Sequence, residues 1–426
     1  MFEELIQEIC QEVSDLKLPH ALVIQDTTEV NFYAHSGRLL VSDPDIGPLT
    51  AKDKSAGFFL HPGLVVDPAG NVPLGISSIT IWNRRFGEPD KHERKYKTRP
   101  IDEKESIRWI NTGQNSAKQL PHVEMLTIIG DREADIYDEF WRLPDARTHL
   151  LIRSSENRKL FKEDKLLFDY LDDLAPCGCI LVPIEHNPKR KSRTARMCVH
   201  YGKVRIAAPG KKGAKDVKDE KRPPFVELYA VYVHELPDSV PSGEEPIVWR
   251  LLTTHAVLDM EMALLIIEWY KLRWLIEELF RVLKSKGLQL EESQLEHGAA
   301  LKKLTILALQ TAQQALLLKQ VRSGQPDLPA ETLYKEEKLV FIDHLNDQLQ
   351  GKTIAQQNPH PKSTLAHVAW VIARLGGWKG YSKSEGPPGV ITMIRGVIAF
   401  NQQFEGWTMA MRFFKQNSSM FSSNSS

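Results

Sequence analysis

Residues 125–140 read MLTIIGDREADIYDEF, and they set the class of the fold. The apolar run at 125–130 is typical of a buried strand, and the segment that Asp131 opens is typical of a helix. A second run, ALVIQD at residues 21–26, also closes with an aspartate, Asp26. Open α/β sheets bind their ligands beyond the carboxyl ends of the strands. On neighbouring strands, the two carboxylates are therefore expected to converge on one point.

A third carboxylate belongs to a predicted helix, in the run EWYKLRWLIEELFRVLK at residues 268–284. At about 100° per residue, Tyr270, Arg273, Glu277 and Lys284 fall within a sector of roughly 60°, with Arg281 beside them. The apolar side chains gather on the opposite side of the helix: Leu272, Leu275, Ile276, Leu279, Val282 and Leu283. One face is expected in the core, and the other presents an acid among bases.

Each of these acids has a structural alternative. Glutamate and lysine at helical spacing are commonly a solvated face with weak ion pairs. An aspartate after a strand is commonly an N-cap or turn residue. Taken together, Asp26, Asp131 and Glu277 indicate a metal site. Three such ligands can hold two Mg²⁺ or Mn²⁺ ions about 3.5 to 4 Å apart, which clamp the attacking and leaving oxygens of an in-line phosphoryl transfer.

These residues resemble the DDE transposases of bacterial insertion sequences, in the group marked by a Tyr, Arg, Glu, Lys signature. Tyr270, Arg273, Glu277 and Lys284 meet the spacing of that signature. Further segments look like the same group: IQDTT around Asp26, GDREADIYD, KSKGLQLEESQLE, ARLGGW and GPPG. The resemblance covers nearly the whole chain and is strongest to the insertion-sequence-four family.

The resemblance implies an α/β (α+β) fold with a ribonuclease-H-like, retroviral-integrase-like mixed-sheet core. Asp26, Asp131 and Glu277 would be the catalytic metal ligands, with two Mg²⁺ (or Mn²⁺) ions per active site. The implied activity is cut-and-paste transposition of an insertion sequence by end cleavage, hairpin formation and resolution, and strand transfer. The implied partners are duplex DNA, as transposon terminal inverted repeats and target, and a second copy of the chain in a synaptic homodimer.

The resemblance also implies a set of DNA-binding residues: Tyr270, Arg273, Lys284, Arg281, Trp249 and Arg153. Trp249, in PIVWRLLTT, matches a tryptophan that stacks on a flipped base when the transposon end forms a hairpin. The alternative for Trp249 is an ordinary strand aromatic. Arg153, in LLIRSS, matches a basic DNA contact, and its alternative is a surface arginine on a strand.

Composition is that of a globular protein of two to three domains, because 426 residues with 42% hydrophobic and 26% charged side chains can bury a core. The 55 basic and 55 acidic residues balance, so DNA affinity must come from local patches. Two basic stretches, Asn187–Arg196 and Lys91–Pro100, are candidates for phosphate contacts. Both have the alternative of a solvated loop.

The four cysteines fit a reducing, bacterial cytoplasmic location. The start of the chain does not look like a signal peptide, and no apolar stretch suits a membrane span. Cys177, Cys179, Cys198 and His200 could in principle form a zinc site. Their one-residue spacings are atypical of zinc sites and alternate along predicted strands, which favours ordinary strand residues over zinc.

Hydrophobic periodicity predicts a core-packing helix over residues 2–16, a β-rich segment over 155–250 and a helical segment over 321–415. With the resemblance, five regions are expected: a first part of the catalytic core (1–154), a β-rich insertion (155–250), a second part of the core with the signature helix (251–320), a helical dimerisation domain (321–415) and a disordered tail (416–426). The segment STLAHVAWVIARLGGW offers an apolar face for dimerisation, with intrachain core as its alternative.

Only 25 residues precede Asp26, where the resembled family usually carries a helical domain that recognises transposon ends. Three functions follow from this. The chain is an active transposase, a nuclease of the same fold, or a truncated, catalytically idle form that binds DNA or sequesters transposase subunits. The acidic triad favours the first two, and the signature with Trp249 favours the first.

Overall fold

The computed structural model describes residues 2–32, 37, 39, 42–50, 55–87, 99–184, 190–210, 222–285 and 287–416. Most of the basic stretch at residues 91–100, namely 91–98, lies outside this described part of the chain, as do residues 187–189 at the start of the second basic stretch. The same holds for the terminal segment 417–426, which covers nearly all of the expected disordered tail.

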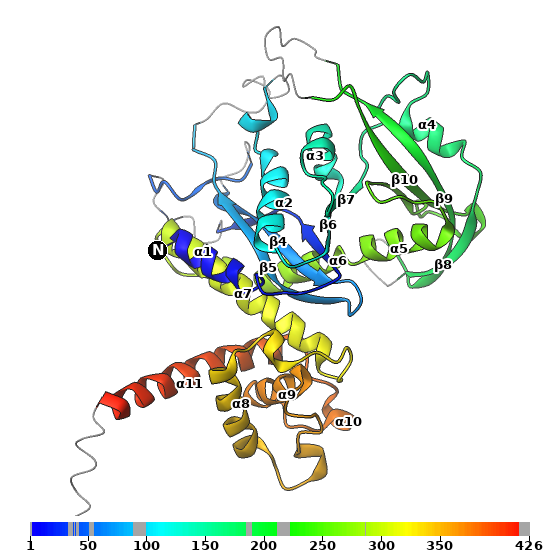
Figure 1. Ribbon diagram of the computed structural model, residues 1–426. Coiled ribbons are helices and arrows are strands. Elements are labelled where there is room, and N and C mark those ends of the chain that lie inside the picture. The colour runs from blue at the N-terminus through cyan, green and yellow to red at the C-terminus, as the bar shows by residue number, and fades with distance from the viewer. Residues whose placement is uncertain are drawn as a thin grey trace, which may run out of the picture. The chain divides into compact units, whose positions relative to one another are not determined.

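Strands of the described chain form one eleven-stranded mixed sheet (Figure 1). They are β1 (His20–Gln25), β2 (Thr28–Asn31), β3 (Gly47–Pro48), β4 (Ala56–Asp67), β5 (Val72–Trp82), β6 (Met125–Gly130), β7 (Thr148–Arg153), β8 (Gly178–Ile184), β9 (Arg193–Ala207), β10 (Phe225–Glu235) and β11 (Val248–Thr253). The spatial order is β2-β4-β1-β6-β7-β11-β10-β9-β8, and β3 and β5 also pair with β4. The predicted α/β class is confirmed.

The centre of the sheet is parallel, and its strands are apolar on both faces. β1 pairs in parallel with β6, and β6 pairs in parallel with β7. Parallel strands are buried from both sides, which explains why these strands are continuous apolar runs without an alternation of polar residues. Both faces of these strands are closed to water. Fully buried side chains on them include Leu22, Val23, Leu126 and Ile128.

Helices cover the two faces of this sheet (Figure 1). They are α1 (Phe2–Gln11), α2 (Ile107–Gln119), α3 (Tyr137–Arg142), α4 (Leu167–Asp172), α5 (Met260–Lys271) and α6 (Trp274–Lys284). Trp109 of α2 and Phe140 of α3 pack with Val23 and Ile128 in one core cluster. Because side chains alternate along a strand, His20 projects to the other face. There it contacts Trp269 of α5, with ring centroids 4.5 Å apart.

The expected β-rich segment is present as β8, β9 and β10, and it extends the same sheet. β11 joins it to the central strands, since Leu252 of β11 is the antiparallel register partner of Ile152 in β7. The strands of the segment therefore share hydrogen bonds with the core sheet instead of forming a sheet of their own.

The chain divides into two compact units: a first unit of Met1–Ser36, Val41–Pro68 and Ile76–Glu277, and a second unit of Gly37–Leu40, Ala69–Gly75 and Glu278–Ser426. The second unit is largely helical. Its main helices are α7 (Gly298–Val321), α8 (Glu336–Leu349), α9 (Leu365–Leu375), α10 (Ser382–Glu385) and α11 (Val390–Gln416).

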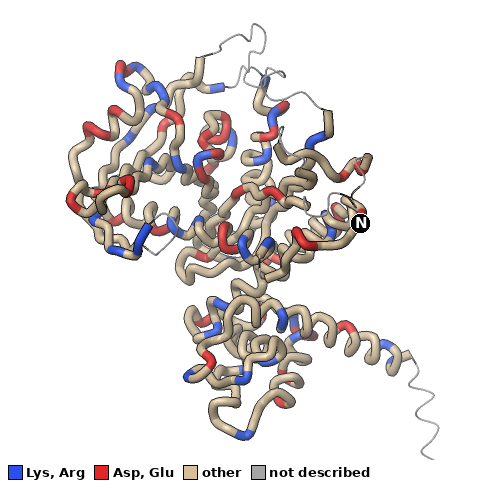
Figure 2. Tube along the Cα trace, turned by 180° about the vertical axis from the view of Figure 1, so that it is seen from behind, with Lys and Arg blue, Asp and Glu red and all other residues tan. Residues whose placement is uncertain are grey.

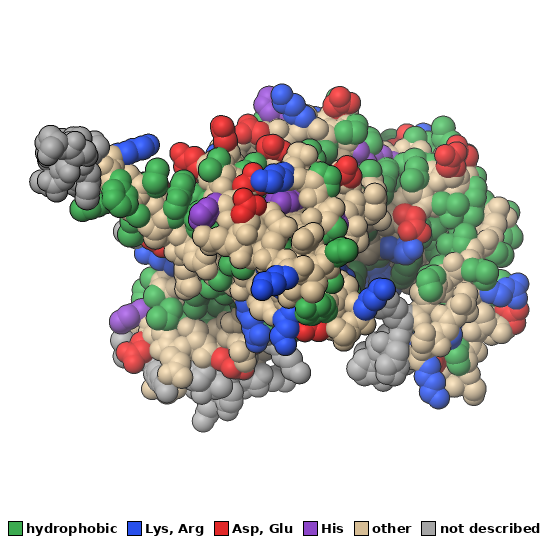
Figure 3. Space-filling view, turned by 90° about the horizontal axis from the view of Figure 1, so that it is seen from below, with side chains coloured by type: hydrophobic (Ala, Val, Ile, Leu, Met, Phe, Trp, Pro, Cys, Tyr) green, Lys and Arg blue, Asp and Glu red, His purple; other side chains and the backbone are tan. Residues whose placement is uncertain are grey.

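The apolar helix α9 forms the core of the second unit. Thr364 caps its start by accepting a hydrogen bond from the backbone N–H of His367. Leu365, Val368, Val371 and other α9 side chains are fully buried within this chain. The intrachain alternative for this segment is therefore correct. The end of α11, by contrast, carries several exposed apolar side chains: Met409, Met411, Phe413 and Phe414. Figure 3 shows hydrophobic side chains on the surface of the molecule in green.

Charges of both signs are interspersed along the trace of each unit, as Figure 2 shows. The neutral balance of the sequence thus does not arise from one acidic and one basic unit. Within the described residues, no helix combines the length and the apolar character that crossing a membrane requires.

Candidate active site

The pairing of β1 with β6 brings the two strand-end aspartates together. Ile24 is the parallel register partner of Ile129, and Asp26 and Asp131 each follow directly on the last residue of their strand, so the two aspartates lie at neighbouring strand ends. Neighbouring strands lie about 4.8 Å apart, and register partners project to the same face. Asp131 also caps a short 3₁₀ helix, because its Oδ1 accepts a hydrogen bond of 2.8 Å from the backbone N–H of Glu133.

This arrangement changes the acidity of Asp26. Burial raises the pKa of its carboxyl, the carboxylate of Asp131 raises it further, and the value reaches about 7. The backbone N–H of Thr27, 2.7 Å from Oδ1, and the charge of Arg273 act in the opposite direction without cancelling the increase. Two carboxylates held close together with little water favour a bound proton or a bound cation.

The signature run does not form the single helix that its sequence predicts. α5 ends at Lys271 and α6 begins at Trp274, with a tight turn between them. Three hydrogen bonds across the turn join residues three apart: Arg273 N to Tyr270 O (3.1 Å), Leu275 N to Leu272 O (2.9 Å) and Ile276 N to Arg273 O (3.2 Å). Such 3₁₀ bonding shifts the angular positions, so the stripe calculated for one ideal helix does not hold across the junction.

The turn places Arg273 between two of the three acids. Its Nη1 lies 3.5 Å from Asp26 Oδ2, and its Nη2 donates to Glu277 Oε1. The Arg273 side chain is 18% exposed. Burial lowers the pKa of the guanidinium, but Tyr270, Glu277 and Asp26 together raise it above its ordinary value. Arg273 therefore stays charged and offsets part of the negative charge of the site.

Tyr270, Arg153 and Trp249 lie beside this arginine. The Tyr270 side chain is buried, and Arg153 reaches its hydroxyl, which finds no acceptor among the described residues. Burial raises the pKa of Tyr270, while Arg273 and then Arg153 lower it, so both guanidinium groups are near the phenol. Trp249 packs edge-on against Tyr270, with centroids 5.9 Å apart. A buried hydroxyl without an acceptor is costly, and a ligand oxygen would satisfy it.

Arg281 and Lys284 follow on α6 beyond Glu277, in the second unit. Arg281 is largely exposed and pairs with Glu278 at 3.4 Å, and Lys284 pairs with Glu291 at 3.7 Å. The structure does not place either cation with the three acids. Their expected DNA contacts remain predictions.

Sequence reasoning missed Arg108, which connects the two loops that carry the aspartates. From α2, its Nε donates to Thr27 Oγ1 (2.9 Å) and its Nη2 donates to Glu133 Oε2 (3.0 Å). Thr27 follows Asp26, and Glu133 lies two residues after Asp131. Arg108 thereby fixes the spacing of the two aspartates. The hydroxyl of Thr27, directly after Asp26 in the motif IQDTT, was the sequence feature that could have indicated a hydrogen-bond donor at this position.

The donor set fits hard divalent cations. Oxygen ligands suit Mg²⁺ and Mn²⁺. Burial and then the Asp131 carboxylate raise the pKa of Asp26 despite the nearby charge of Arg273, so a further positive charge would be stabilised here. The side-chain oxygens of Asp26, Asp131 and Glu277 do not all lie within 4.8 Å of one another. Arg273 stands between Asp26 and Glu277 instead.

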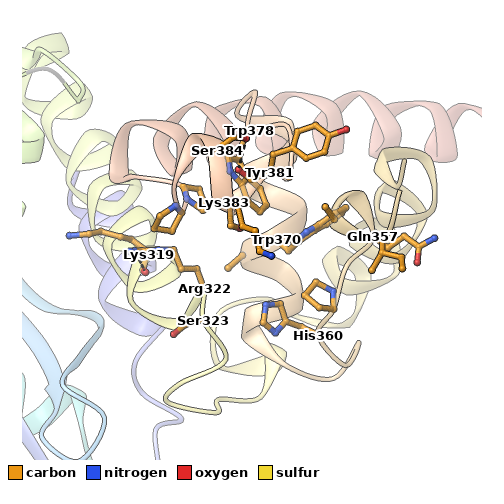
Figure 4. Close-up of a pocket in the computed structure, with 18 of the residues that line it drawn as sticks. Lys319, Arg322, Ser323, Gln357, His360, Trp370, Trp378, Tyr381, Lys383 and Ser384 are labelled. Carbon is orange, nitrogen blue, oxygen red and sulfur yellow. Dashed lines mark hydrogen bonds between the residues drawn. The ribbon is translucent and has the colours of Figure 1, made fainter. Parts of the chain in front are cut away.

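A separate cavity of about 800 Å³ lies wholly in the second unit (Figure 4). Lys319 and Arg322 border it from the end of α7, and Trp370, Trp378 and Tyr381 add aromatic walls. No acidic side chain is among the described residues that line it. The three acids belong to the first unit up to Glu277, so this cavity is not part of the acidic site.

Comparison with known proteins gives little further guidance. No protein-family model matches the chain. A solved structure of the piggyBac transposase synaptic complex with hairpin DNA is similar with a TM-score of 0.35 and 7% identity. The match covers 72% of this chain and 48% of that one, so this chain corresponds to about half the length of that transposase. A likeness at this TM-score does not establish a shared fold.

Proposed function

We propose that this chain is a DDE transposase of the insertion-sequence-four family, with a ribonuclease-H-like core. One observation carries the proposal: Arg273 contacts the carboxylates of Asp26 and Glu277, and the Asp131 carboxylate lies close enough to Asp26 to raise its pKa. Asp26 and Asp131 follow two neighbouring parallel strands, and Glu277 belongs to α6. Such a group of acids suits phosphoryl transfer better than it suits structural support.

In this proposal, Asp26, Asp131 and Glu277 hold two Mg²⁺ or Mn²⁺ ions. When bound, the ions supply charge stabilisation to the attacking and leaving oxygens of an in-line displacement. Arg273 keeps Asp26 and Glu277 apart and oriented before binding. Arg108 does the same for the loops of Asp26 and Asp131. Preorganised charges of this kind lower the cost of reorganisation during reaction.

Duplex DNA would bind through the cations and the phenol beside the acids. The Tyr270 hydroxyl has an unused hydrogen-bonding capacity, and Arg153 and Arg273 supply positive charge next to it, which together suit a phosphate oxygen. Trp249 would stack on a base displaced at the transposon end. Lys284 and Arg281 would extend the phosphate contacts along α6.

Cut-and-paste transposition also requires the two transposon ends to be held together. We assign this role to a homodimer of the chain. The exposed apolar end of α11 supports this assignment, since Met409 and Phe413 are 60% and 56% exposed. Exposed apolar side chains in a row are a feature of interaction surfaces. Each protomer would cut one end within the pair.

The test is Mg²⁺-dependent cleavage of a labelled duplex that carries the flanking ends of the gene. Three proteins are compared: the parent chain, Glu277→Gln, and the matched control Glu278→Gln. Glu278 is the next residue of α6 and pairs with Lys319 at 2.8 Å, so its substitution alters the helix charge equally without touching Asp26 or Arg273. We expect strand cleavage at the element boundary by the parent and the control, and none by Glu277→Gln, which still folds and binds DNA.

Other outcomes separate the alternative functions. Cleavage without preference for the element ends would identify a ribonuclease-H-like nuclease. Binding of the ends without cleavage by well-folded parent protein would identify an inhibitory form. Cleavage by Glu277→Gln at the rate of the parent would show that Glu277 is not a metal ligand, and the proposal would fail.

A further inference from the structure

The β-rich part of the sheet carries a second group of ligand-type side chains, separate from the acids. Cys198 and His200 lie on β9, and His234 is the register partner of Cys198 on β10. The ligand atoms of these three residues all lie within 4.8 Å of one another. On the other side of β9, Cys179 of β8 is also the register partner of Cys198. Directly opposed residues of antiparallel strands share a face, so all four residues project to the same side of the sheet.

His200 is held in the tautomer that a metal ion requires. Its Nδ1 lies 2.8 Å from the carbonyl oxygen of Leu174. A carbonyl only accepts, so Nδ1 carries the proton and donates it. Nε2 then keeps its lone pair, and this buried atom has no partner among the described residues. The residue is only 5% exposed. Metal-binding histidines are commonly fixed by such a bond from the second ring nitrogen to a backbone carbonyl.

His234 and Cys198 complete the set of donors, with Cys198 buried and His234 half-buried. The rings of His234 and His200 stack with centroids 5.1 Å apart, and Nδ1 of His234 is buried with no partner in the described chain. A buried polar atom left unpaired is costly, so the two unpaired ring nitrogens favour a ligand.

We propose that Cys179, Cys198, His200 and His234 bind one Zn²⁺ ion. Two thiolates and two imidazoles are a common tetrahedral zinc set, and the thiolates balance the charge of the ion. Bond lengths of about 2.0 Å to nitrogen and 2.3 Å to sulfur put the ligand atoms roughly 3.3 to 3.8 Å apart. Three of the four already lie within 4.8 Å, so small side-chain rotations close the site. Cysteine spacing alone conceals this set, because the second histidine comes from another strand.

The ion would fasten the edge of the sheet. Among the described strands, β8 is the last in the order, and its neighbour there is β9. Edge strands are exposed to fraying and to pairing with other chains. A cation bound by Cys179 on β8, Cys198 and His200 on β9 and His234 on β10 would join all three strands by side chains as well as by backbone hydrogen bonds.

The experiment uses the full chain, stripped with a chelator under reducing conditions and titrated with Zn²⁺ or Co²⁺ alone. We expect one bound ion per chain by elemental mass spectrometry. Co²⁺ should give thiolate charge-transfer absorption with the visible bands of a tetrahedral site. Removal of the metal should increase hydrogen exchange in β8. Cys179→Ser changes an exposed side chain, so it tests the site without risk to the core. Cys177→Ser is the matched control, since its Sγ approaches the Ala175 carbonyl at 3.7 Å instead.

Loss of the charge-transfer band and of tight binding in Cys179→Ser and His234→Gln, with both retained in Cys177→Ser, would support the site. Equal loss in Cys177→Ser would overturn the ligand assignment. Absence of stoichiometric metal binding by folded protein with four titratable thiols would overturn the proposal. A disulfide between Cys179 and Cys198 in freshly purified, unreduced protein that takes up no metal after reduction would overturn it equally. None of these readouts depends on DNA cleavage.

Discussion

Replacement of Asp26 by asparagine should stabilise the metal-free protein, and more strongly at pH 8 than at pH 5. Burial and then the Asp131 carboxylate raise the pKa of Asp26 to about 7, whereas the pKa of aspartate in an unfolded chain is about 3.9. Between these two pH values the folded state holds a proton that the unfolded state has lost. The free energy of unfolding of the parent therefore falls as the pH rises through this window. Asparagine has no such ionisation.

The size of the effect follows from the pKa difference. Three pKa units correspond to roughly 4 kcal/mol at pH 8, where the carboxyl is ionised in both states, and to roughly 1.5 kcal/mol at pH 5. Two facts reduce this estimate. The Asp26 side chain is 18% exposed, so water screens its charge in part, and asparagine loses the charge contact with Arg273 at 3.5 Å. With both corrections we expect a gain of about 2 to 3 kcal/mol at pH 8 and of about 1 kcal/mol at pH 5.

The assay is hydrogen exchange of β1 and β6 peptides in increasing urea with a chelator present, because these peptides report on the first unit alone. Glu29→Gln is the control, since it removes an exposed carboxylate on the nearby strand β2. Added Mg²⁺ should reverse the order, by stabilising the parent through mass action and leaving Asp26→Asn unchanged. A loss of stability in Asp26→Asn at pH 8, or a gain that is the same at both pH values, would refute the reasoning.

Three further predictions concern residues around the site. Burial and then His149 lower the pKa of His255 to about 3 and that of His20 to about 4. As the pH is lowered from about 7 to 4, the unfolded state takes up protons on these histidines before the folded state does, so their contribution lowers the free energy of unfolding. In urea titrations, His255→Gln should make this dependence on pH less steep. Arg108→Gln should weaken Mn²⁺ binding by about tenfold in calorimetry at unchanged circular dichroism, because the aspartate loops lose their shared support. Trp249→Ala should leave the first nick intact and reduce the hairpin product roughly tenfold on denaturing gels, through lost base stacking. A steeper pH dependence of stability in His255→Gln would contradict the first expectation. Unchanged Mn²⁺ affinity in Arg108→Gln would contradict the second, and equal loss of nick and hairpin in Trp249→Ala would contradict the third.

The strand-end aspartates illustrate what local sequence can reach. An apolar run that stops at a carboxylate identifies a buried strand and the position where it leaves the sheet. Asp26 and Asp131 both follow such runs, and the structure confirms the two strands that they follow, β1 and β6. The strands could be predicted because burial on both faces leaves a continuous apolar run in the sequence.

The signature run shows where the same reasoning stops. Helical periodicity across residues 268–284 predicts one stripe, yet the chain turns at Leu272 and Arg273. No proline or glycine marks the turn, so nothing local announces it. The contact of Arg273 with Asp26 involves residues far apart in the sequence, and only the packed sheet brings that partner into reach. For the same reason, periodicity left open whether the apolar face of α9 meets a partner chain or its own unit.

By itself, the sequence determined the α/β class, the strands that end in carboxylates and the residue types available for metal and phosphate chemistry. These properties follow from periodicity and side-chain chemistry, which act within a few residues of the chain. Tertiary structure alone decided that Arg273 joins Asp26 to Glu277, that Arg108 supports both aspartate loops, and that His234 meets Cys198 across two strands. Strand pairing and burial set those contacts. Both depend on which distant segments exclude water together, and no local pattern encodes that choice.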